Sequence, residues 1–519
     1  MMLVPLGLIG PIALFLAAAF AFSRPGRRPK GVPALSEAGA LIALAAALAG
    51  LVQRIVFGVG DLSLFSGPFA LVFRLDSLSA TMSVLVAFVG WIVVRYARPY
   101  LDGAEREGRF HALMSLTLGA VLALAQAGSV AILILAFLAV GGGIRQLLLF
   151  YAERSEARRA ATKFTLVWRA GDAALVIAGV LLVAAYGTGD LAVIAAQVPG
   201  VVPPAAHAAV AFLVLCAALK TAAFPVHGWL TEVMEAPTPV SALLHAGVIN
   251  AGGFLLIRNA DLVQASPGAM AALVMIGGLT ALFGAVVMLT QSAVKTALAW
   301  STVSQMGFML LQCGLGLWPL ALLHIVAHSL YKAHAFLSSG GAVAAVASLR
   351  RPGPIAAPSP STVFKSFTLS VALFALVAAG FALAFGAKSP QALALGAMLI
   401  FGVAYLVAQG MADAAPADLT RRTGIAALAA ALAYFTFQQI AAVLWGGGLP
   451  PTPGAGPLEW ALIVLSVASF GAVAVAQTLF PLWAHHPSTA GLRVHLVNGL
   501  YLNALLDRLI GGFRTTGGR

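Results

Sequence analysis

The chain has 519 residues, of which 61% are hydrophobic and only 9% are charged. Soluble domains typically carry about 25% charged residues, so this composition excludes an ordinary soluble protein and indicates a polytopic membrane protein. The net charge of +13 is spread over short loops between apolar runs, which argues against nucleic-acid binding. The two cysteines, Cys216 and Cys313, both lie within apolar runs and are expected to be buried thiols rather than disulfide or metal-binding groups.

Apolar runs of membrane-crossing length, about 20 residues, recur along the whole chain. The first is expected to be a retained span rather than a cleaved signal peptide, because its charges (Arg24 to Lys30) follow it and none precede it. We predict an all-α transmembrane bundle of about 14–15 spans with one broken helix near 205–235. The predicted spans lie near 2–22, 35–57, 69–94, 111–127, 129–150, 164–186, 205–224, 239–258, 268–290, 293–313, 318–347, 363–386, 390–411, 424–446 and 457–481.

Basic residues gather in alternate loops, while the intervening loops are nearly free of them. Membrane proteins concentrate Lys and Arg on the cytoplasmic side, so the pattern predicts an N-terminus outside and a C-terminus in the cytoplasm. The basic loops are 24–30, 95–109, 154–163, the segment around Lys295, Arg350 with Arg351, and Arg421 with Arg422.

The most informative stretch is residues 219–252, LKTAAFPVHGWLTEVMEAPTPVSALLHAGVINAG, which places Lys220 and His245 in apolar surroundings. An ionisable group at the bilayer centre costs about 2.5–3.5 kcal/mol on insertion scales, so such groups normally mark ion or proton pathways. A broken helix is tolerated there only where protein or water satisfies the freed backbone groups. The stretch therefore predicts a buried ion-handling site at a helix break formed by three prolines: Pro225, Pro237 and Pro239.

A second group of basic residues lies in LLHIVAHSLYKAHAFLSSG, residues 322–340. His324, His328 and Lys332 recur every four residues and share one helix face, and His334 is close to them in sequence. Burial opposes charging all four groups together, so some are expected to be neutral and able to exchange protons. Two histidines at i and i+4 also have the spacing of metal ligands, but no carboxylate or thiol accompanies them, which disfavours zinc.

The run HGWLTEVMEAPTPVSALLHAGVINAGGFLL, residues 227–256, resembles the core motif of the antiporter-like membrane subunits. These are the large membrane subunits of proton-pumping NADH:quinone oxidoreductase and of the multi-subunit cation/proton antiporters. Within this family, the sequence of the run is most similar to that of the DabB branch, the membrane subunits of DAB inorganic-carbon uptake complexes. The resemblance covers roughly residues 70–350 and the C-terminal segment, and it implies two inverted repeats of about five helices each.

This resemblance implies a role for each matching basic residue. Lys220 matches the functional lysine of the family's broken seventh span, and His324, His328 and Lys332 match the histidine and lysine chain of its eleventh span. The family also has a histidine at the position of His245, which next to Lys220 favours a proton relay. From the residues alone, Lys220 could also be a lysine at a helix end that reaches towards the membrane surface. A buried histidine is likewise often no more than a hydrogen-bonded core group.

The sequence departs from the family at two positions that normally carry charge. Val140 stands where the fifth-span glutamate partner of the lysine would align, and the twelfth-span lysine has no recognisable counterpart. We therefore expect Asp172, one helical turn after Arg169, to be the counter-charge of Lys220. A purely structural Arg169–Asp172 pair is the alternative.

Several further polar residues are weaker candidates. Glu232 and Glu235 follow the helix break and are expected either to assist proton uptake or to be solvated loop acids, and Lys295 begins a hydroxyl-rich helix. The tail has apolar residues at helical spacing, which is typical of a helix that lies on a membrane surface or binds a partner. Similarity to the end of the DabB branch favours docking of a cytoplasmic partner through four tail residues: Tyr501, Asn503, Asp507 and Arg508.

We expect five regions along the chain. They are N-terminal transmembrane helices at 1–110, a first antiporter-like repeat at 111–260, a second at 261–411, C-terminal transmembrane helices at 412–483 and a cytoplasmic amphipathic tail at 484–519.

The resemblance to the DabB branch implies a non-enzymatic transport subunit of a prokaryotic inner membrane, with no cofactor of its own. It would conduct protons, or sodium, and so drive CO2 hydration to bicarbonate in a soluble zinc-binding partner similar to carbonic anhydrases (DabA-like). The alternatives are a proton-translocating subunit of a respiratory complex or a cation/proton antiporter, and a membrane anchor that conducts nothing. The insertion cost of the buried basic residues counts against an anchor.

Overall fold

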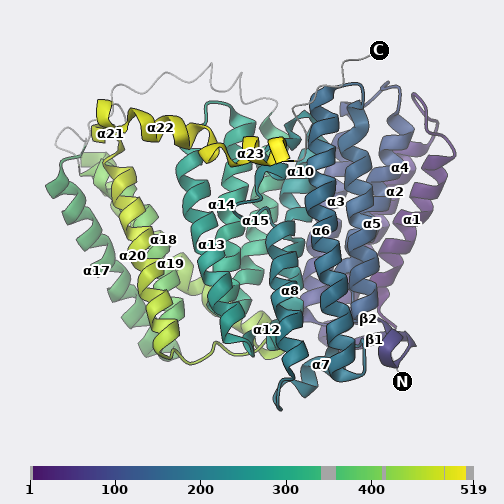
Figure 1. Cartoon of the computed structure of the whole chain (residues 1–519), viewed down its shortest axis with the longest axis horizontal. Coiled ribbons are helices and arrows are strands. Elements are labelled where there is room, and N and C mark those ends of the chain that lie inside the picture. Colours follow the sequence, from purple (N-terminus) through teal and green to yellow (C-terminus); the bar gives the residue numbers. More distant parts are fainter. Residues whose placement is uncertain (1–3, 340–357, 412–416, 484–485, 510–519) are drawn as a thin grey trace.

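The structure, a computed structural model, describes residues 4–339, 358–411, 417–483 and 486–509. It confirms the predicted polytopic helical fold (Figure 1). Within the described residues, twelve helices are long and apolar enough to cross a membrane, and two shorter apolar helices, Leu6–Phe22 and Pro204–Lys220, accompany them. Arg350 and Arg351 lie outside the described residues, as does the end of the span that we expected to reach residue 347.

The predicted spans reappear as helices, with the broken region divided into short pieces. The N-terminal half contains α1 (Ile9–Phe22), α2 (Val32–Phe57), α3 (Ser77–Tyr100), α4 (Glu107–Ala125), α5 (Val130–Leu148), α6 (Ser155–Tyr186), α7 (Leu191–Gln197), α8 (Pro204–Lys220), α9 (Gly228–Thr231), α10 (Thr238–Ala246) and α11 (Ala251–Arg258). The remainder contains α12 (Ala260–Gln264), α13 (Pro267–Met288), α14 (Val294–Gly314), α15 (Trp318–Ser338), α17 (Pro360–Phe385), α18 (Pro390–Gly410), α19 (Ala417–Trp445), α20 (Pro457–Thr478), α21 (Phe480–Trp483), α22 (Ala490–Val497) and α23 (Leu502–Leu509).

The third span begins at Ser77 rather than near residue 69, which corrects the sequence prediction. The preceding residues form an antiparallel hairpin of β1 (Gly60–Phe65) and β2 (Leu71–Leu75). The helix starts where it does because Asp76 caps it: its carboxylate accepts the Ser79 amide at 2.8 Å, and the Ser79 hydroxyl accepts the Asp76 amide at 2.7 Å.

Asp76 also fixes the hairpin end to the helix that follows the broken region. Its carboxylate is bonded by Arg258, whose side chain is 6% exposed and which also donates to the Ala125 carbonyl at 3.3 Å. Burial raises the pKa of Asp76, but Arg258 and the hydrogen bonds from Ser79 outweigh burial and hold that pKa below its ordinary value. This end of the bundle is therefore tied together by an ion pair whose arginine is buried and whose aspartate is partly buried.

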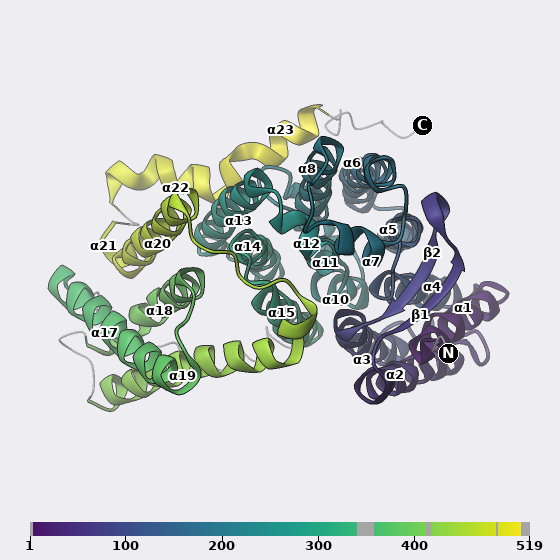
Figure 2. The ribbon, with the colours of Figure 1, turned by 90° about the horizontal axis from the view of Figure 1, so that it is seen from below.

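The helices form two groups side by side, as the view along them shows (Figure 2). One group contains α1 to α15, and the other contains α17, α18 and α20. The long helix α19 joins the groups, since it contacts α17 and α18 as well as α15 and α3. Helices α22 and α23 lie across one end of the bundle rather than along it (Figure 1).

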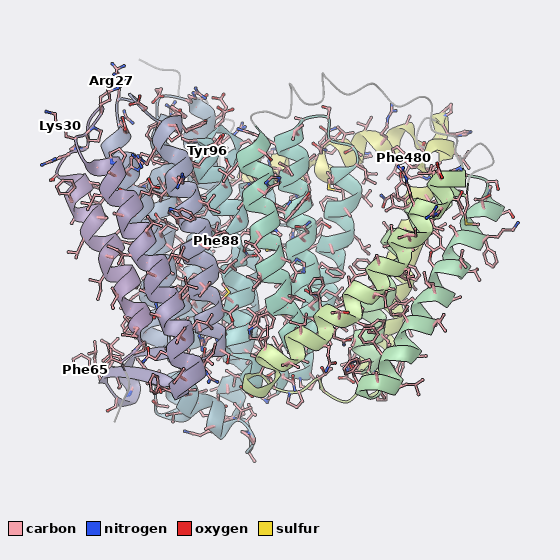
Figure 3. All side chains as sticks on the ribbon, turned by 180° about the vertical axis from the view of Figure 1, so that it is seen from behind. Arg27, Lys30, Phe65, Phe88, Tyr96 and Phe480 are labelled. Atoms are coloured by element: carbon pink, nitrogen blue, oxygen red, sulfur yellow. The ribbon has the colours of Figure 1, made fainter. Side chains whose placement is uncertain are left out.

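The basic loops gather at the end of the bundle where α22 and α23 lie. Arg27 and Lys30 point outward at this end, together with Phe480, whereas Phe65 of the hairpin is at the opposite end (Figure 3). Arg28 pairs with Asp102 at 3.1 Å and Arg154 with Glu235 at 3.0 Å, so loops distant in sequence meet there. We name this the basic end of the molecule.

Candidate functional site

Lys220 is the last residue of α8 and its side chain is fully buried. The helix ends there because Ala222 adopts a left-handed backbone with φ of 53° and because Pro225 has no amide hydrogen to donate. An ammonium in the last turn of a helix faces the partial negative charge of the unsatisfied carbonyls. The helix break therefore places a positive charge inside the bundle, and the free carbonyls at the end of α8 partly stabilise that charge.

Asp172 of α6 is the direct partner of Lys220. Its Oδ1 lies 2.7 Å from the Lys220 ammonium, and its Oδ2 lies 3.0 Å from a guanidinium nitrogen of Arg169. The Asp172 side chain is 6% exposed and the Arg169 side chain 47% exposed, so the carboxylate bridges a buried cation and an outer one. Sequence analysis proposed this contact between Lys220 and Asp172, and the structure brings the two residues together.

Aromatic rings complete the surroundings of Lys220. Its ammonium lies 3.9 Å from the ring centroid of Trp168 and 4.7 Å from that of Phe137, both distances at which a cation interacts with the ring face. Val140, one turn after Phe137 and at the position of the family's glutamate, is 1% exposed in the core. Two rings and the Asp172 carboxylate thus surround the lysine, and no acid stands at the position of the family's glutamate.

The second centre joins α10, α14 and α15. Lys332 is fully buried and donates to the Leu298 carbonyl at 3.0 Å and to the Ser301 hydroxyl, and no ion pair to a carboxylate is found for it among the described residues. His245 is also fully buried; its Nδ1 lies 3.2 Å from the Thr302 hydroxyl, and its ring stacks on Phe336 at 4.3 Å. Lys332 and His245 lie within electrostatic range of each other.

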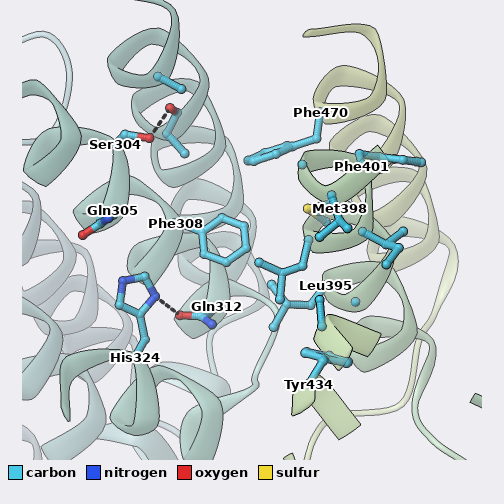
Figure 4. Close-up of a pocket in the computed structure, with 18 of the residues that line it drawn as sticks. Ser304, Gln305, Phe308, Gln312, His324, Leu395, Met398, Phe401, Tyr434 and Phe470 are labelled. Carbon is cyan, nitrogen blue, oxygen red and sulfur yellow. Dashed lines mark hydrogen bonds between the residues drawn. The ribbon is translucent and has the colours of Figure 1, made fainter. Parts of the chain in front are cut away.

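His328 and His324 extend this centre along α15 to a cavity of about 740 Å³. The cavity lies between α13–α15 and the group of α18–α20, and its wall is mostly apolar (Figure 4). His324 Nδ1 lies 2.9 Å from the Gln312 amide oxygen, whereas both ring nitrogens of the buried His328 lack a hydrogen-bond partner in the described part of the chain. A buried imidazole with two open positions beside a cavity can bind water and pass protons.

The segment after the helix break links the two centres. His227 is 1% exposed and packs on Trp300 with ring centroids 4.8 Å apart. The residue after Trp300 is Ser301, which accepts from Lys332. From the break, Asn250 also reaches α15 and donates to the Ser329 hydroxyl at 3.0 Å.

A third centre, at the basic end, was not predicted. Lys163 of α6 is buried and lies 2.7 Å from a Glu232 oxygen, 2.6 Å from an Asp507 oxygen and 2.6 Å from the Asn503 amide oxygen. Sequence analysis treated Lys163 only as a loop charge. Its position on the buried face of α6, with Ala160, Val167 and Asp172 at helical spacing, was the signal that could have found it.

The remaining predicted residues fall into different environments. Pro237 and Pro239 start α10, and Pro225 lies in the break between α8 and α9. His334 is exposed and does not share the buried face of Lys332, contrary to the expected cluster of four basic groups. Lys295 is half-buried in the first turn of α14.

The tail residues divide between the two faces of the helices that carry them. Asn503 and Asp507 point inward to Lys163, whereas Tyr501 is 39% exposed and Arg508 is also exposed. No group of three or more metal-ligating residues occurs within the described ranges.

Two models of known protein families match the greater part of this chain. The model for the transmembrane region of NADH:quinone oxidoreductase and Mrp antiporter subunits matches residues 127–411, and a model for the N-terminus of complex I chain 5 matches residues 64–111.

Among solved structures, the Mrp complex from Dietzia sp. DQ12-45-1b aligns with 99% of this chain and 58% of its own matched chain, at 24% identity and a TM-score of 0.59. Respiratory complex I from Thermus thermophilus aligns with 95% of this chain and 99% of its own, at 20% identity and a TM-score of 0.54. At this level of identity, these likenesses show a shared fold.

Three relatives with 32–42% sequence identity show to which branch of the fold this chain is most similar in sequence. The probable inorganic carbon transporter subunit DabB2 of Halothiobacillus neapolitanus is 38% identical over 483 residues, which cover 91% of this chain and 85% of the relative. DabB of Hydrogenovibrio crunogenus is 42% identical over 271 residues, 52% of each chain. NADH-quinone oxidoreductase subunit L of Mycobacterium tuberculosis is 32% identical over 421 residues, 78% of this chain and 64% of its own. The chain therefore belongs to the family of antiporter-like membrane subunits that includes the DabB inorganic carbon transporter subunits.

Proposed function

We propose that this chain is the membrane subunit of an energy-coupled inorganic-carbon uptake complex and that it conducts protons, or sodium, through its buried basic residues. The observation that carries the proposal is the Asp172–Lys220 pair at the helix break, in a chain 38% identical to a DabB2 subunit. Burying such groups costs free energy, and a cation pathway is the usual reason for membrane proteins to retain them.

Asp172 gives the pathway a mechanism for changing state. With Lys220 protonated, the carboxylate is shared between Lys220 and Arg169. If Lys220 passes its proton on, Asp172 keeps a counter-charge in Arg169, so the carboxylate is never left unpaired. Proton loss at Lys220 therefore costs less than it would for an isolated ion pair, and protons would continue through His245, Lys332, His328 and His324.

The partner in this proposal is a soluble zinc-binding subunit, similar to carbonic anhydrases, that hydrates CO2. It would bind at the basic end, which by the positive-inside rule faces the cytoplasm of a prokaryotic inner membrane. Exposed apolar side chains on the tail helices, among them Leu505 and Leu509 at 54% and 84% exposure, offer it a contact surface beside Tyr501 and Arg508. Coupling requires that the partner's active and inactive states differ in their affinity for the protonation states of this chain.

Two measurements test the proposal. Gentle purification of the tagged chain should bring down one large zinc-containing soluble protein, and Lys220→Ala should abolish bicarbonate accumulation in cells while leaving expression and co-purification intact. A Lys220→Ala strain that accumulates bicarbonate at the wild-type rate would refute the conduction role. Recovery of several small membrane subunits, or of subunits with flavin or iron–sulfur groups, in place of the zinc protein would refute the carbon-uptake role.

A second candidate is a proton-translocating subunit of a respiratory complex or a cation/proton antiporter. The 32% identity to subunit L of Mycobacterium tuberculosis over 421 residues favours it. The burial of Val140 where those subunits place an acid counts against it.

A further inference from the structure

Lys163 lies at a meeting point of three parts of the chain. It belongs to α6, Glu232 follows the short helix α9, and Asn503 and Asp507 belong to α23 near the end of the described residues. The Lys163 side chain is 1% exposed, that of Asp507 6% and that of Glu232 15%. A segment about 340 positions away in sequence therefore completes the surroundings of a buried lysine.

The buried charges of this cluster do not balance without the partly exposed Arg159. One ammonium faces two carboxylates at 2.7 and 2.6 Å, and the nearest further cation is Arg159, 3.8 Å from Glu232 and 41% exposed. The second oxygen of Glu232 is buried without a hydrogen-bond partner in the described part of the protein. Uptake of one proton by either carboxylate would neutralise the trio, and the unpartnered oxygen is a site where that proton can bind.

The cluster adjoins the helix break that holds Lys220. His227 comes directly before α9 and lies within electrostatic range of Lys163. The His227 Nδ1 is buried and has no hydrogen-bond partner among the described residues. In the same turn, Trp229 donates to the carbonyl of Leu219, the residue before Lys220, at 3.2 Å. A proton held by the cluster is thus separated from Lys220 by a short segment that contains an imidazole.

Helix α23 is fitted closely over this segment. A Cβ added to Gly228 would lie 2.0 Å from the Asn503 amide oxygen and 3.4 Å from its Cβ, so only a glycine leaves room for Asn503. The Asn503 amide also donates to Glu232. Before α23, Gly499 packs against Trp300, and the Val497 carbonyl accepts from Gln291 at 3.3 Å.

We infer that Lys163, Glu232 and Asp507 form a proton-uptake site at the basic end, and that the tail helix is part of the pathway because it supplies Asp507. This inference rests on the proposed conduction of protons. The groups that face the site are Arg159 and Lys163 of α6, Glu232 and His227 beside α9, and Asp507 of α23, with the Arg154–Glu235 pair at its edge. An exchangeable proton here would pass through His227. Burial and the charge of Lys163 lower the pKa of His227 to about 4, so the imidazole would hold the proton only in transit to Lys220.

The test is proton flux into liposomes that contain the full chain with its co-purified partner, followed by a pH-sensitive dye under an imposed potential. Asp507→Asn keeps the shape of the side chain but removes the exchangeable charge, so flux should fall about tenfold or more, a conservative figure for a positioned proton-transfer group. Asp507→Glu should recover most of the flux. Asp418→Asn makes the same replacement at an exposed carboxylate in the first turn of α19, so it is the matched control and should stay within about twofold.

A disulfide lock separates proton uptake from simple docking of the tail. Cysteines at 228 and 503 would have their Cβ atoms about as close as those of a natural disulfide, so oxidation should hold α23 in place. Comparison of the oxidised pair with and without Asp507→Asn then measures the carboxyl group alone. A locked Asp507→Asn protein that conducts as well as its locked parent would show that Asp507 is only an anchor and would overturn the inference.

The two proposals fail in distinguishable ways. If the wild-type complex conducts no protons, the proposed function is wrong. If the wild-type complex conducts and Lys220→Ala does not, but Asp507→Asn conducts normally with the tail still cross-linkable, then only the uptake site is wrong.

Discussion

The two buried lysines of the bundle are stabilised in opposite ways. Lys220 has a carboxylate at 2.7 Å, two aromatic rings and a helix C-terminus around it. Lys332 has a carbonyl and a hydroxyl as hydrogen-bond acceptors and, among the described residues, no carboxylate in an ion pair with it. The first lysine is therefore prepared to carry a charge, whereas the second is surrounded by groups that accept a hydrogen bond without offering a counter-charge.

This difference suggests a division of roles along one pathway. A lysine paired with a carboxylate holds its proton firmly. It releases the proton more easily when the carboxylate has a second cation, and Arg169 is that second cation for Asp172. A lysine without a counter-charge releases its proton more readily than a paired one, and His328 and His245 are imidazoles of the kind that pass protons on. Proton transfer from the first centre to the second would thus run from a holding site to a relaying site.

The largest effect is expected where the counter-charge is removed. Asp172→Asn leaves Lys220 buried without a carboxylate, and breaking a buried pair from one side typically costs about 3–5 kcal/mol of stability. The variant should unfold at clearly lower temperature in detergent, which scanning calorimetry or a thiol-independent melting assay would measure. Replacing both members, Asp172→Asn with Lys220→Met, should recover most of that loss.

The same comparison can be tested by moving the acid. Val140→Glu in the Asp172→Asn background restores a carboxylate at the family's position, one turn from Phe137 and on the same buried face. It should recover part of the stability lost in Asp172→Asn. A Val140→Glu/Asp172→Asn protein less stable than Asp172→Asn alone would show that α5 cannot serve Lys220 in this chain.

The fold was largely predictable because span length and apolar runs depend on the bilayer and not on packing details. The exception is the second strand of the hairpin, Leu71–Leu75, which was read as the start of the third span because its apolar residues come shortly before those of α3. The capping sequence from Asp76 to Ser79 marked the true helix start. Short apolar runs of this kind fit a strand or a helix equally well until the cap is considered.

The candidate site was predictable where motif and periodicity coincide, and not where it depends on the docking of a distant segment. The Lys220–Asp172 contact was expected from helix spacing and family resemblance, and the structure places the two side chains together. The Lys163 cluster could not be found in this way, because Asp507 comes from α23 and its position depends on tertiary packing. The outward direction of His334, in contrast, could have been predicted, because a residue two positions after Lys332 does not lie on the same face of a helix.

An intermediate effect, of opposite sign at the two lysines, is expected from matched replacements. Lys332→Met removes a buried ammonium that has no counter-charge and should stabilise the fold by on the order of 1 kcal/mol or more. Lys220→Met removes a paired charge and leaves Asp172 with Arg169 alone, so it should destabilise the fold, but by less than Asp172→Asn. Melting temperatures of the two variants in the same detergent measure the difference. Equal shifts of the same sign would break the distinction between a holding and a relaying lysine.

The smallest effect is expected at His334, which makes it the control for its buried neighbour. His334→Ala alters an exposed side chain, so its stability should change by no more than about 0.5 kcal/mol and proton flux should be unchanged. His328→Ala removes a buried imidazole whose two nitrogens have no hydrogen-bond partner in the described part of the chain, and it should slow flux; its stability should fall only by the packing of the imidazole, since no hydrogen bond is lost. Flux into liposomes from both variants separates the two roles. A slowed His334→Ala together with a normal His328→Ala would mean that protons leave the second centre by the outer face of α15 rather than through the cavity.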